Sequence, residues 1–230
     1  MACFVQVNQC TFSRDGRLLL TGSDDCNVCV WNVGNGNLLS KVEGHTEPHF
    51  IDVALTLFSN MVQRAVLLFL GHTKSVESVC FSRDSKLLAS GSWDHKAIMW
   101  DSKSGLIVKT LSGHQNVIKT CAFSFNGEHL ATGSWDYTVR IWKIRKVKRK
   151  LILRGHTGNV SCVAFSGFGM LASGSWDKTV RVWDSRNGLL IFLLTEHTGR
   201  VMALSFSLDA ILLVTAAEDK TVECEGIHLN

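Results

Sequence analysis

The chain has 230 residues, of which 46% are hydrophobic and 19% are charged, and its formal net charge is +4. This composition excludes a disordered chain, and the length is enough to bury a sizeable core in one large domain or two small ones. The charge is too small to indicate nucleic acid or a membrane surface as a partner.

The first residues, MACFVQVNQCTF, lack the basic start and the long apolar run of a signal peptide. We therefore expect an intracellular protein, cytoplasmic or nuclear, whose eight cysteines are reduced and packed as small apolar groups. Cys26 and Cys29 have the spacing of a metal-ligand pair, but no second pair or nearby histidines complete the set. We expect both to pack on a strand. The sequence predicts no metal, and it contains no phosphate-binding glycine motif that would indicate a cofactor.

Residues 1–43 are predicted to form a first unit that begins directly with an inner strand around residues 5–13. This unit contains Thr21, Asp25 and Trp31, but Cys3 stands where later units have a histidine. The next segment, 44–70, is degenerate, because only 27 residues separate His45 from His72 and the segment contains no Trp-Asp pair. Its apolar stretch, 51–70, carries polar and charged residues that are costly inside a bilayer, so we expect no membrane span.

Residues 71–112 form the first regular unit. The segments VESVCFS (76–82), KLLASGS (86–92), AIMWD (97–101) and LIVKTL (106–111) are short and apolar, and polar turns separate them. The first three alternate with a period of two. This pattern predicts four β-strands in one unit.

The same pattern returns along the chain. After His72, the equivalent positions are His114, His156 and His197, at steps of 42, 42 and 41 residues. Trp100, Trp142 and Trp183 keep the same spacing. The units are therefore 71–112, 113–154, 155–195 and an incomplete 196–230, which has Glu225 at the tryptophan position. Four strands in about 42 residues is the period of a β-propeller blade.

A Gly-His pair followed about 29 residues later by Trp-Asp resembles the WD40 repeat, and the match is strongest over residues 71–184. The resemblance implies an all-β WD40 β-propeller and a single domain over 1–230. Only about five to six units are recognisable, so we expect an incomplete or irregular ring. We expect the 230 residues to be a fragment, splice form or faulty gene model of a longer propeller, and a six-bladed or irregular propeller is the alternative.

The resemblance also implies a buried hydrogen-bond set in each regular unit, which joins indole, hydroxyl, imidazole and carboxylate. The three sets are His72, Ser90, Asp94 and Trp100; His114, Thr132, Asp136 and Trp142; and His156, Ser173, Asp177 and Trp183. Serine, histidine and aspartate are also the residues of a nucleophilic triad. Three near-copies argue against catalysis, because a catalytic site is normally single. No separate, non-repeated cluster of titratable groups indicates an enzyme.

The residue before each of these aspartates is Trp93, Trp135 or Trp176, and in the resembled family this loop lies at one end of the ring. Three large aromatics in a row predict an apolar recognition patch. Filler between neighbouring blades is the other interpretation, and both stay open. The family places two more positions at this end: Glu77, Lys119, Ser161 and Met202 five residues after each histidine, and Ser75, Val117, Asn159 and Arg200 three residues after it.

Two further motifs have alternative interpretations. The basic run KIRKVKRK (143–150) fits an exposed outer strand and its turn, or else a nuclear-import signal or a patch for an acidic partner. Trp183, Asp184 and Arg186 resemble the WDxR box of some cullin ubiquitin-ligase substrate receptors.

We therefore expect a non-enzymatic scaffold or adaptor that presents propeller loops to other proteins or peptides. The alternative is a substrate receptor of a cullin-type ubiquitin ligase. Nucleic acid and small-molecule substrates are not expected as partners, because the basic run lacks interleaved aromatic residues and no cofactor motif is present.

Overall fold

The structure, a computed structural model, describes residues 6–43, 69–145, 150–207 and 209–227. In these residues it contains strands, turns and loops but no helix. The strands form five separate sheets that follow one another along the chain. The prediction of an all-β chain built from blade-like units is confirmed.

The first sheet contains β1 (Val7–Phe12), β2 (Leu18–Ser23), β3 (Val28–Asn32), β4 (Leu38–Glu43) and β5 (Phe69–Leu70). The second contains β6 (Val76–Phe81), β7 (Leu87–Ser92), β8 (Lys96–Asp101) and β9 (Ile107–Ser112). The third contains β10 (Ile118–Phe123), β11 (His129–Ser134), β12 (Val139–Lys143) and β13 (Lys150–Leu153). The fourth contains β14 (Val160–Phe165), β15 (Met170–Ser175), β16 (Val180–Asp184) and β17 (Leu190–Leu194). The fifth contains β18 (Val201–Phe206), β19 (Leu212–Ala217) and β20 (Val222–Gly226).

Within each sheet, consecutive strands pair antiparallel through short turns, which is the meander that four closely spaced strands must adopt. The exception is β5, which pairs parallel with β4, with Val42 opposite Phe69. The register shifts by one residue near the start of every first strand, for example between Val76 and Ser78. This repeated bulge increases the local twist of each inner strand.

Apolar clusters hold neighbouring sheets together, because alternate side chains of a strand point to opposite faces of its sheet. Between the first and second sheets, Leu20 and Val30 pack with Val79 and Trp100, all nearly inaccessible to solvent. Equivalent clusters join the second sheet to the third, the third to the fourth, and the fourth to the fifth. The core is therefore a series of four layers between sheets.

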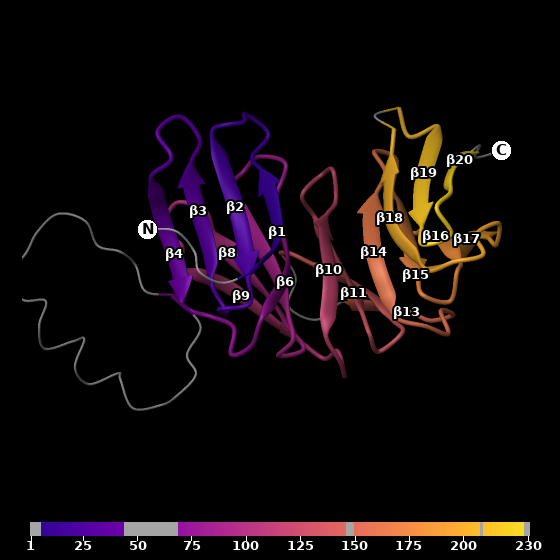
Figure 1. Cartoon of the computed structure of the whole chain (residues 1–230), viewed down its shortest axis with the longest axis horizontal. Coiled ribbons are helices and arrows are strands. Elements are labelled where there is room, and N and C mark those ends of the chain that lie inside the picture. Colours follow the sequence, from indigo (N-terminus) through magenta and orange to yellow (C-terminus); the bar gives the residue numbers. More distant parts are fainter. Residues whose placement is uncertain (1–5, 44–68, 146–149, 208, 228–230) are drawn as a thin grey trace, which may run out of the picture.

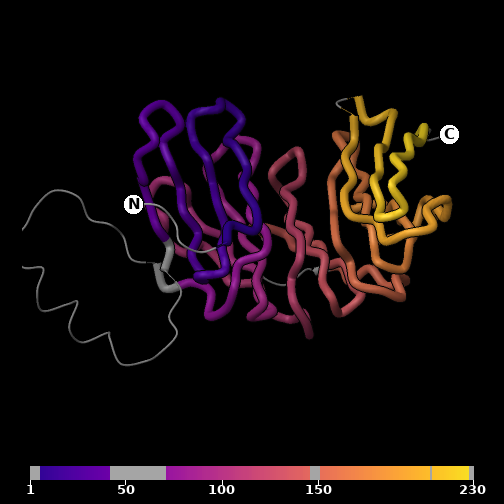
Figure 2. Tube along the Cα trace, viewed as in Figure 1, coloured from indigo at the N-terminus to yellow at the C-terminus, as the bar shows by residue number. Residues whose placement is uncertain are grey.

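The sheets stand side by side along an open arc. In Figure 1 the first sheet lies on the left and the fifth on the right, with β1 and β18 on either side of β10. Figure 2 shows the same order as a colour sequence from indigo to yellow. The inner strands β1, β6, β10, β14 and β18 contact one another in chain order.

Three predicted segments differ from the structure or lie partly outside the described residues. The degenerate unit 44–70 lies outside the described residues, except for Phe69 and Leu70, which join the first sheet as β5. Cys26 does not lie on a strand; it lies in the turn before β3 with φ +66°, although both it and Cys29 are buried as expected. Residues 146–149 of the basic run are outside the described residues, and β13 begins at Lys150.

The close approach of the sheets depends on one glycine in the second strand of each of the first four sheets. A Cβ atom on Gly174 would lie 2.6 Å from Val201 and 2.7 Å from Cys162, and one on Gly133 would lie 2.6 Å from Thr120 and Val160. Neither distance is compatible with normal packing. These glycines therefore set the spacing between sheets.

We predict that Gly174→Ala lowers the free energy of unfolding by about 1–3 kcal/mol, because the methyl group forces the fourth and fifth sheets apart. Gly167→Ala is the matched control, since no atom lies within 4 Å of its would-be Cβ. Urea denaturation of both variants measures the difference. Equal stability of the two variants would contradict the role of Gly174.

Candidate functional site: the tryptophan end of the sheets

The hydrogen-bond set of the second sheet is continuous from indole to carboxylate. Trp100 Nε1 donates to Ser90 Oγ at 3.0 Å, and Ser90 Oγ lies 2.7 Å from His72 Nε2. His72 Nδ1 lies 2.9 Å from Asp94 Oδ2. Because the carboxylate can only accept, the imidazole proton is assigned to Nδ1. In that tautomer Nε2 accepts from the serine hydroxyl, whose oxygen in turn accepts from the indole.

The third and fourth sheets repeat this geometry within 0.2 Å. Their contacts are Trp142–Thr132 2.9 Å, His114–Thr132 2.8 Å, His114–Asp136 2.8 Å, Trp183–Ser173 2.9 Å, His156–Ser173 2.8 Å and His156–Asp177 2.9 Å. The fifth sheet keeps His197, Thr215 and Asp219. In the first sheet Trp31 donates to Thr21 at 3.0 Å. Cys3, which stands at the histidine position of that unit, lies outside the described residues.

The hydroxyls of these sets cannot act as nucleophiles. Ser90, Thr132 and Ser173 are 0% exposed, so no substrate can reach their oxygen atoms. Each hydroxyl also accepts an indole N–H, which engages one of its two lone pairs. The sets can therefore stabilise the fold but have no route to covalent chemistry.

The aspartate of each set also organises the loop between the second and third strands. Asp94 Oδ2 accepts the backbone N–H of Thr73 at 3.2 Å, and Oδ1 accepts that of Lys96 at 2.9 Å. Burial alone would raise the pKa of Asp94, but the hydrogen bond from His72 and these N–H groups outweigh it and hold the pKa below its ordinary value. The residue after the aspartate, His95, adopts φ +67° to close the turn.

This loop carries the three predicted tryptophans, and the structure brings them together. The Trp93 and Trp135 rings lie 5.3 Å apart in an edge-to-face arrangement, and the Trp135 and Trp176 rings lie 5.6 Å apart. Trp93 is 39% exposed, whereas the other two are half-buried. We call these three residues the tryptophan row. It runs across the second, third and fourth sheets.

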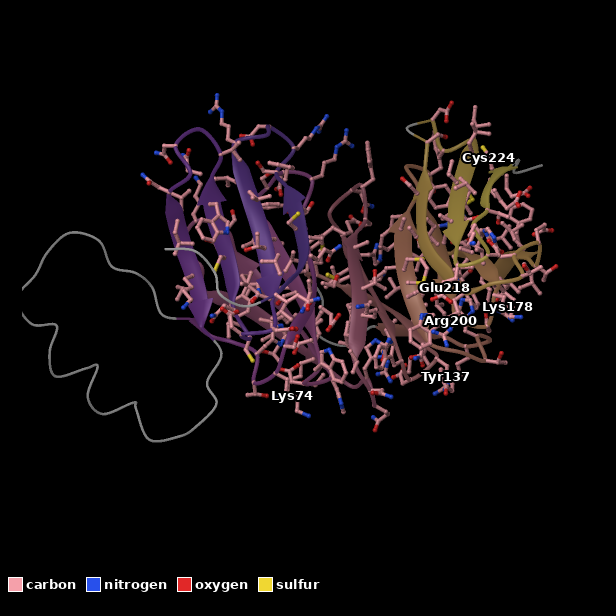
Figure 3. All side chains as sticks on the ribbon, in the orientation of Figure 1. Lys74, Tyr137, Lys178, Arg200, Glu218 and Cys224 are labelled. Atoms are coloured by element: carbon pink, nitrogen blue, oxygen red, sulfur yellow. The ribbon has the colours of Figure 1, made fainter. Side chains whose placement is uncertain are left out.

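Charged side chains flank the row at both ends. Glu77 accepts hydrogen bonds from the Trp93 indole and from Lys119, whose Nζ is 2.5 Å away. At the other end, Arg200 lies over the Trp176 ring at 4.3 Å, and its Nε is 3.7 Å from Glu218. Figure 3 shows Lys74, Tyr137, Lys178, Arg200 and Glu218 gathered along this same end of the molecule.

The other predicted positions at this end behave differently. Met202, which lies on β18 of the fifth sheet, is 47% exposed. Ser161 turns towards the neighbouring sheet and donates to the carbonyl oxygens of Val201 and Gly174. Val117 is only 2% exposed, so the prediction that its side chain lies on the surface is wrong, and the side chain packs in the core. Its backbone carbonyl accepts a hydrogen bond from Trp135 N, in the tryptophan loop, at 2.9 Å. Ser75 and Asn159 make the equivalent carbonyl contacts to Trp93 and Trp176.

Sequence reasoning missed the residues that continue the row. Asp24 and Glu218 occupy the tryptophan position in the first and fifth sheets. Their backbone N–H groups donate to the carbonyl oxygens of Gln6 and Arg200, as the tryptophan N–H groups donate to the carbonyl oxygens of the segment before the first strand. Asp24 accepts from Asn8 and from Ser75, both at 2.7 Å, and so ties the first sheet to the second. Counting one residue back from the aspartate of every unit would have identified both.

The WDxR-like motif lies at the opposite end of the strands. Arg186 donates to both carboxylate oxygens of Asp184, at 3.1 and 3.0 Å, and its side chain is 81% exposed. Beside it is an open cavity of about 330 Å³ that is lined by Phe168, Met170, Leu189, Leu190 and Ile191, among others. Trp183 takes no part in this surface, because it is buried in its hydrogen-bond set.

Among the described residues, no group of three or more histidine, cysteine, aspartate or glutamate side chains is placed to hold a metal ion. None of the described segments is a helix long and apolar enough to cross a membrane.

Comparison with known proteins gives one family. The sequence profile of the WD domain, G-beta repeat matches residues 3–32, 63–101, 105–143, 147–184 and 188–224. Similar proteins include Protein HIRA of Dictyostelium discoideum, 31% identical over 101 residues, which are 44% of this chain and 8% of that protein. A subunit of chromatin assembly factor 1 from Gallus gallus is 31% identical over 106 residues (46% and 18%). E3 ubiquitin-protein ligase COP1 of Pisum sativum is 32% identical over 122 residues (43% and 17%). The chain spans less than a fifth of the length of each of these relatives.

We predict that Asp177→Ala lowers the free energy of unfolding by at least about 2 kcal/mol, because it leaves His156 and the N–H groups of Thr157 and Thr179 without their acceptor at about 1–3 kcal/mol each. Asp136→Ala should behave alike. Thermal and urea melts check this, with Asp84→Ala, at an exposed turn, as the control. A melt for Asp177→Ala no different from that of the control would count against the set.

Proposed function

We infer that this chain, which belongs to the WD domain, G-beta repeat family, is a non-enzymatic interaction module. We propose that the tryptophan row is its main partner-binding surface. The row of indole contacts across three sheets is the observation that carries this proposal. The mechanism is placement: sheets held by buried networks present loops at fixed distances, so that a partner meets a preformed surface.

Packing alone does not account for these tryptophans. Trp93 leaves more than a third of its surface exposed, and the buried Trp135 Nε1 has no hydrogen-bond partner in the described structure. A buried unpaired donor costs free energy that a leucine or phenylalanine at the same position would avoid. Tryptophan is favoured over leucine or phenylalanine where a binding partner buries its large aromatic surface.

The charges around the row indicate the chemistry of the partner. Glu77 and Glu218 are each engaged by a cation of this end, Lys119 and Arg200 respectively. Lys74 and Lys178 are exposed, and no ion pair involves either of them among the described residues. A protein segment with an apolar or aromatic anchor and flanking carboxylates would complement this surface.

The names of the relatives favour an intracellular site of action, since one belongs to a chromatin assembly factor. We propose that this chain acts in a comparable way, by holding other proteins in an assembly. The alternation of carboxylates and cations along the row does not form the continuous basic surface that nucleic acid requires.

We predict that Trp93→Ala weakens partner binding about tenfold or more and that the variant with all three tryptophans replaced by alanine abolishes capture. Affinity purification from cells with quantitative mass spectrometry measures the captured proteins. The control is Phe125→Ala, an exposed aromatic (50%) at the opposite end of the strands. Circular dichroism melts accompany each variant. Capture that is unchanged in a folded triple variant would refute the binding role, and loss of folding in Trp93→Ala would favour filler.

A second function has a specific observation in its favour. Arg186 is fixed by two hydrogen bonds to Asp184 and projects into solvent beside the exposed Phe168 (71%) and Leu189 (66%). An arginine with an apolar rim is a recurrent form of a protein-binding hot spot. Together with the similarity to COP1, this geometry supports the role of a substrate receptor in a cullin-type ubiquitin ligase.

For this second function we predict that Arg186→Ala removes the co-purification of a ligase adaptor while leaving capture through the tryptophan row unchanged. Lys103→Ala, at the equivalent turn of the second sheet, is the matched control and should have no effect. Immunoprecipitation from cells distinguishes the outcomes. An adaptor that is absent with the unaltered chain, or present equally with Arg186→Ala, would exclude the receptor role.

A further inference from the structure

Two cysteine side chains meet in the layer between the second and third sheets. Cys80 lies on β6 and Cys121 on β10, which are neighbouring inner strands (Figure 1), and their Sγ atoms are 3.4 Å apart. Both are free thiols, because a disulfide would hold the two sulfur atoms at about 2.05 Å. Neither thiol belongs to a hydrogen-bond set or to the tryptophan row, so the functions proposed above leave the pair unused.

A difference of one residue in repeat position turns the two thiols towards each other. Cys80 is eight residues after the histidine of its unit, and Cys121 is seven residues after its own. Successive residues of a strand point to opposite faces of the sheet, so Cys80 faces the third sheet and Cys121 faces the second. Both pack in the apolar cluster between these sheets. Between the third and fourth sheets the same two positions hold Ala122 and Val163, so the thiol pair is particular to one layer and is not a feature of the repeat.

Hydrogen bonds favour the reactive form of one thiol. Ser78 Oγ, also on β6, donates to Cys121 Sγ at 3.1 Å and accepts the Cys121 backbone N–H at 2.8 Å. The hydrogen bond from Cys80, together with that from Ser78, outweighs burial and lowers the pKa of the Cys121 thiol. The thiolate is the form that reacts with oxidants. Because Cys80 is partly exposed whereas Cys121 is only 6% exposed, a small oxidant suits this site better than a thiol of another protein.

We propose that Cys80 and Cys121 form a redox-sensitive pair, which hydrogen peroxide converts into a disulfide between the second and third sheets. The Cys121 thiolate attacks one peroxide oxygen: an S–O bond forms, the O–O bond breaks, and the other oxygen leaves as hydroxide, which takes up the proton that the thiol lost. The Cys80 sulfur then attacks the sulfur of this sulfenic acid: an S–S bond forms, the S–O bond breaks, and the hydroxyl group leaves with the Cys80 proton as water. Two thiols are oxidised, and one peroxide is reduced to two waters.

The new bond needs only a small movement. From 3.4 Å the sulfur atoms approach by about 1.4 Å to reach bonding distance, a shift that side-chain rotation supplies. The bond closes a loop of about 40 residues, which restricts the unfolded chain and so stabilises the folded one.

The same two sheets carry the first part of the tryptophan row. Glu77 and Lys119 pair across β6 and β10, and Trp93 meets Trp135 in the loops of these sheets. Oxidation therefore fastens the second and third sheets covalently, and a thiol reductant releases them. This chemistry does not depend on what the tryptophan row binds.

The experiment treats the reduced full chain with hydrogen peroxide, alkylates the remaining thiols after unfolding, and maps the tryptic peptides by mass spectrometry. Cys80 falls in the peptide 75–83 and Cys121 in the peptide 120–140, and neither peptide contains a second cysteine. We expect the link between these two peptides to be at least about tenfold more abundant than any other cysteine pair, because the folded chain holds their sulfur atoms together. Cys162, buried on the inner strand of the fourth sheet, is the internal control and should be recovered alkylated.

Urea denaturation gives a second readout. Peroxide should raise the midpoint of the unaltered chain, and dithiothreitol should reverse the rise. Cys10→Ser, which removes an exposed thiol, is the matched control and should behave like the unaltered chain. Cys80→Ser should show no rise.

Recovery of Cys80 and Cys121 as alkylated thiols would overturn the proposal, as would a link between them that is no more abundant than other pairs. A rise in midpoint that Cys80→Ser shares would also count against it. The peptide mapping uses the unaltered chain, so its result stands even where Cys80→Ser fails to fold. Capture through the tryptophan row is measured on the reduced chain, so failure of that function is a separate result.

Discussion

The hydrogen bond between imidazole and carboxylate is the contact on which the arrangement of this chain depends. Through His72 and Asp94 it joins the segment that enters each inner strand to the loop between the second and third strands of the same sheet. Both oxygens of the carboxylate are used, one by the histidine and the entering backbone, the other by the turn. A buried network of this kind fixes one geometry only when every member has a partner, which holds here from indole to carboxylate. The loop and its exposed tryptophan inherit that fixed position.

The tryptophan row then follows from the spacing of the sheets. Gly91, Gly133 and Gly174 let neighbouring sheets approach until a side chain at the glycine position would collide with the next inner strand. At that separation the indoles of adjacent loops meet at 5.3 and 5.6 Å, a distance at which aromatic rings attract one another. The surface across three sheets thus arises because the same loop position is repeated in each sheet and because a glycine sets the distance between neighbouring sheets.

The features that could be predicted from the sequence are those that belong to one repeat. Strand positions, the members of each hydrogen-bond set and the loop position of Trp93 follow from periodicity and from the resemblance, because they involve residues of a single unit. Contacts between units could not be predicted, since they depend on the distance between sheets: the Lys119–Glu77 pair, the bond from Ser161 to Val201, and the burial of Val117. The left-handed φ of Cys26 was also hidden, because a non-glycine residue gives no signal for it.

Repetition also shows which contacts of a unit are separable. Every unit is written with one face for the sheet before it and one for the sheet after it, so the apolar positions recur from sheet to sheet. The fifth sheet lost its tryptophan, with Glu225 in its place, but Leu212, Val214 and Val222 occupy the positions at which the fourth sheet has Met170, Ala172 and Val180. It also keeps the contacts of His197 with Thr215 and Asp219. The packing between sheets and the link from imidazole to carboxylate therefore do not depend on the indole, whose hydrogen bond is an addition to a unit that is already positioned by the other two.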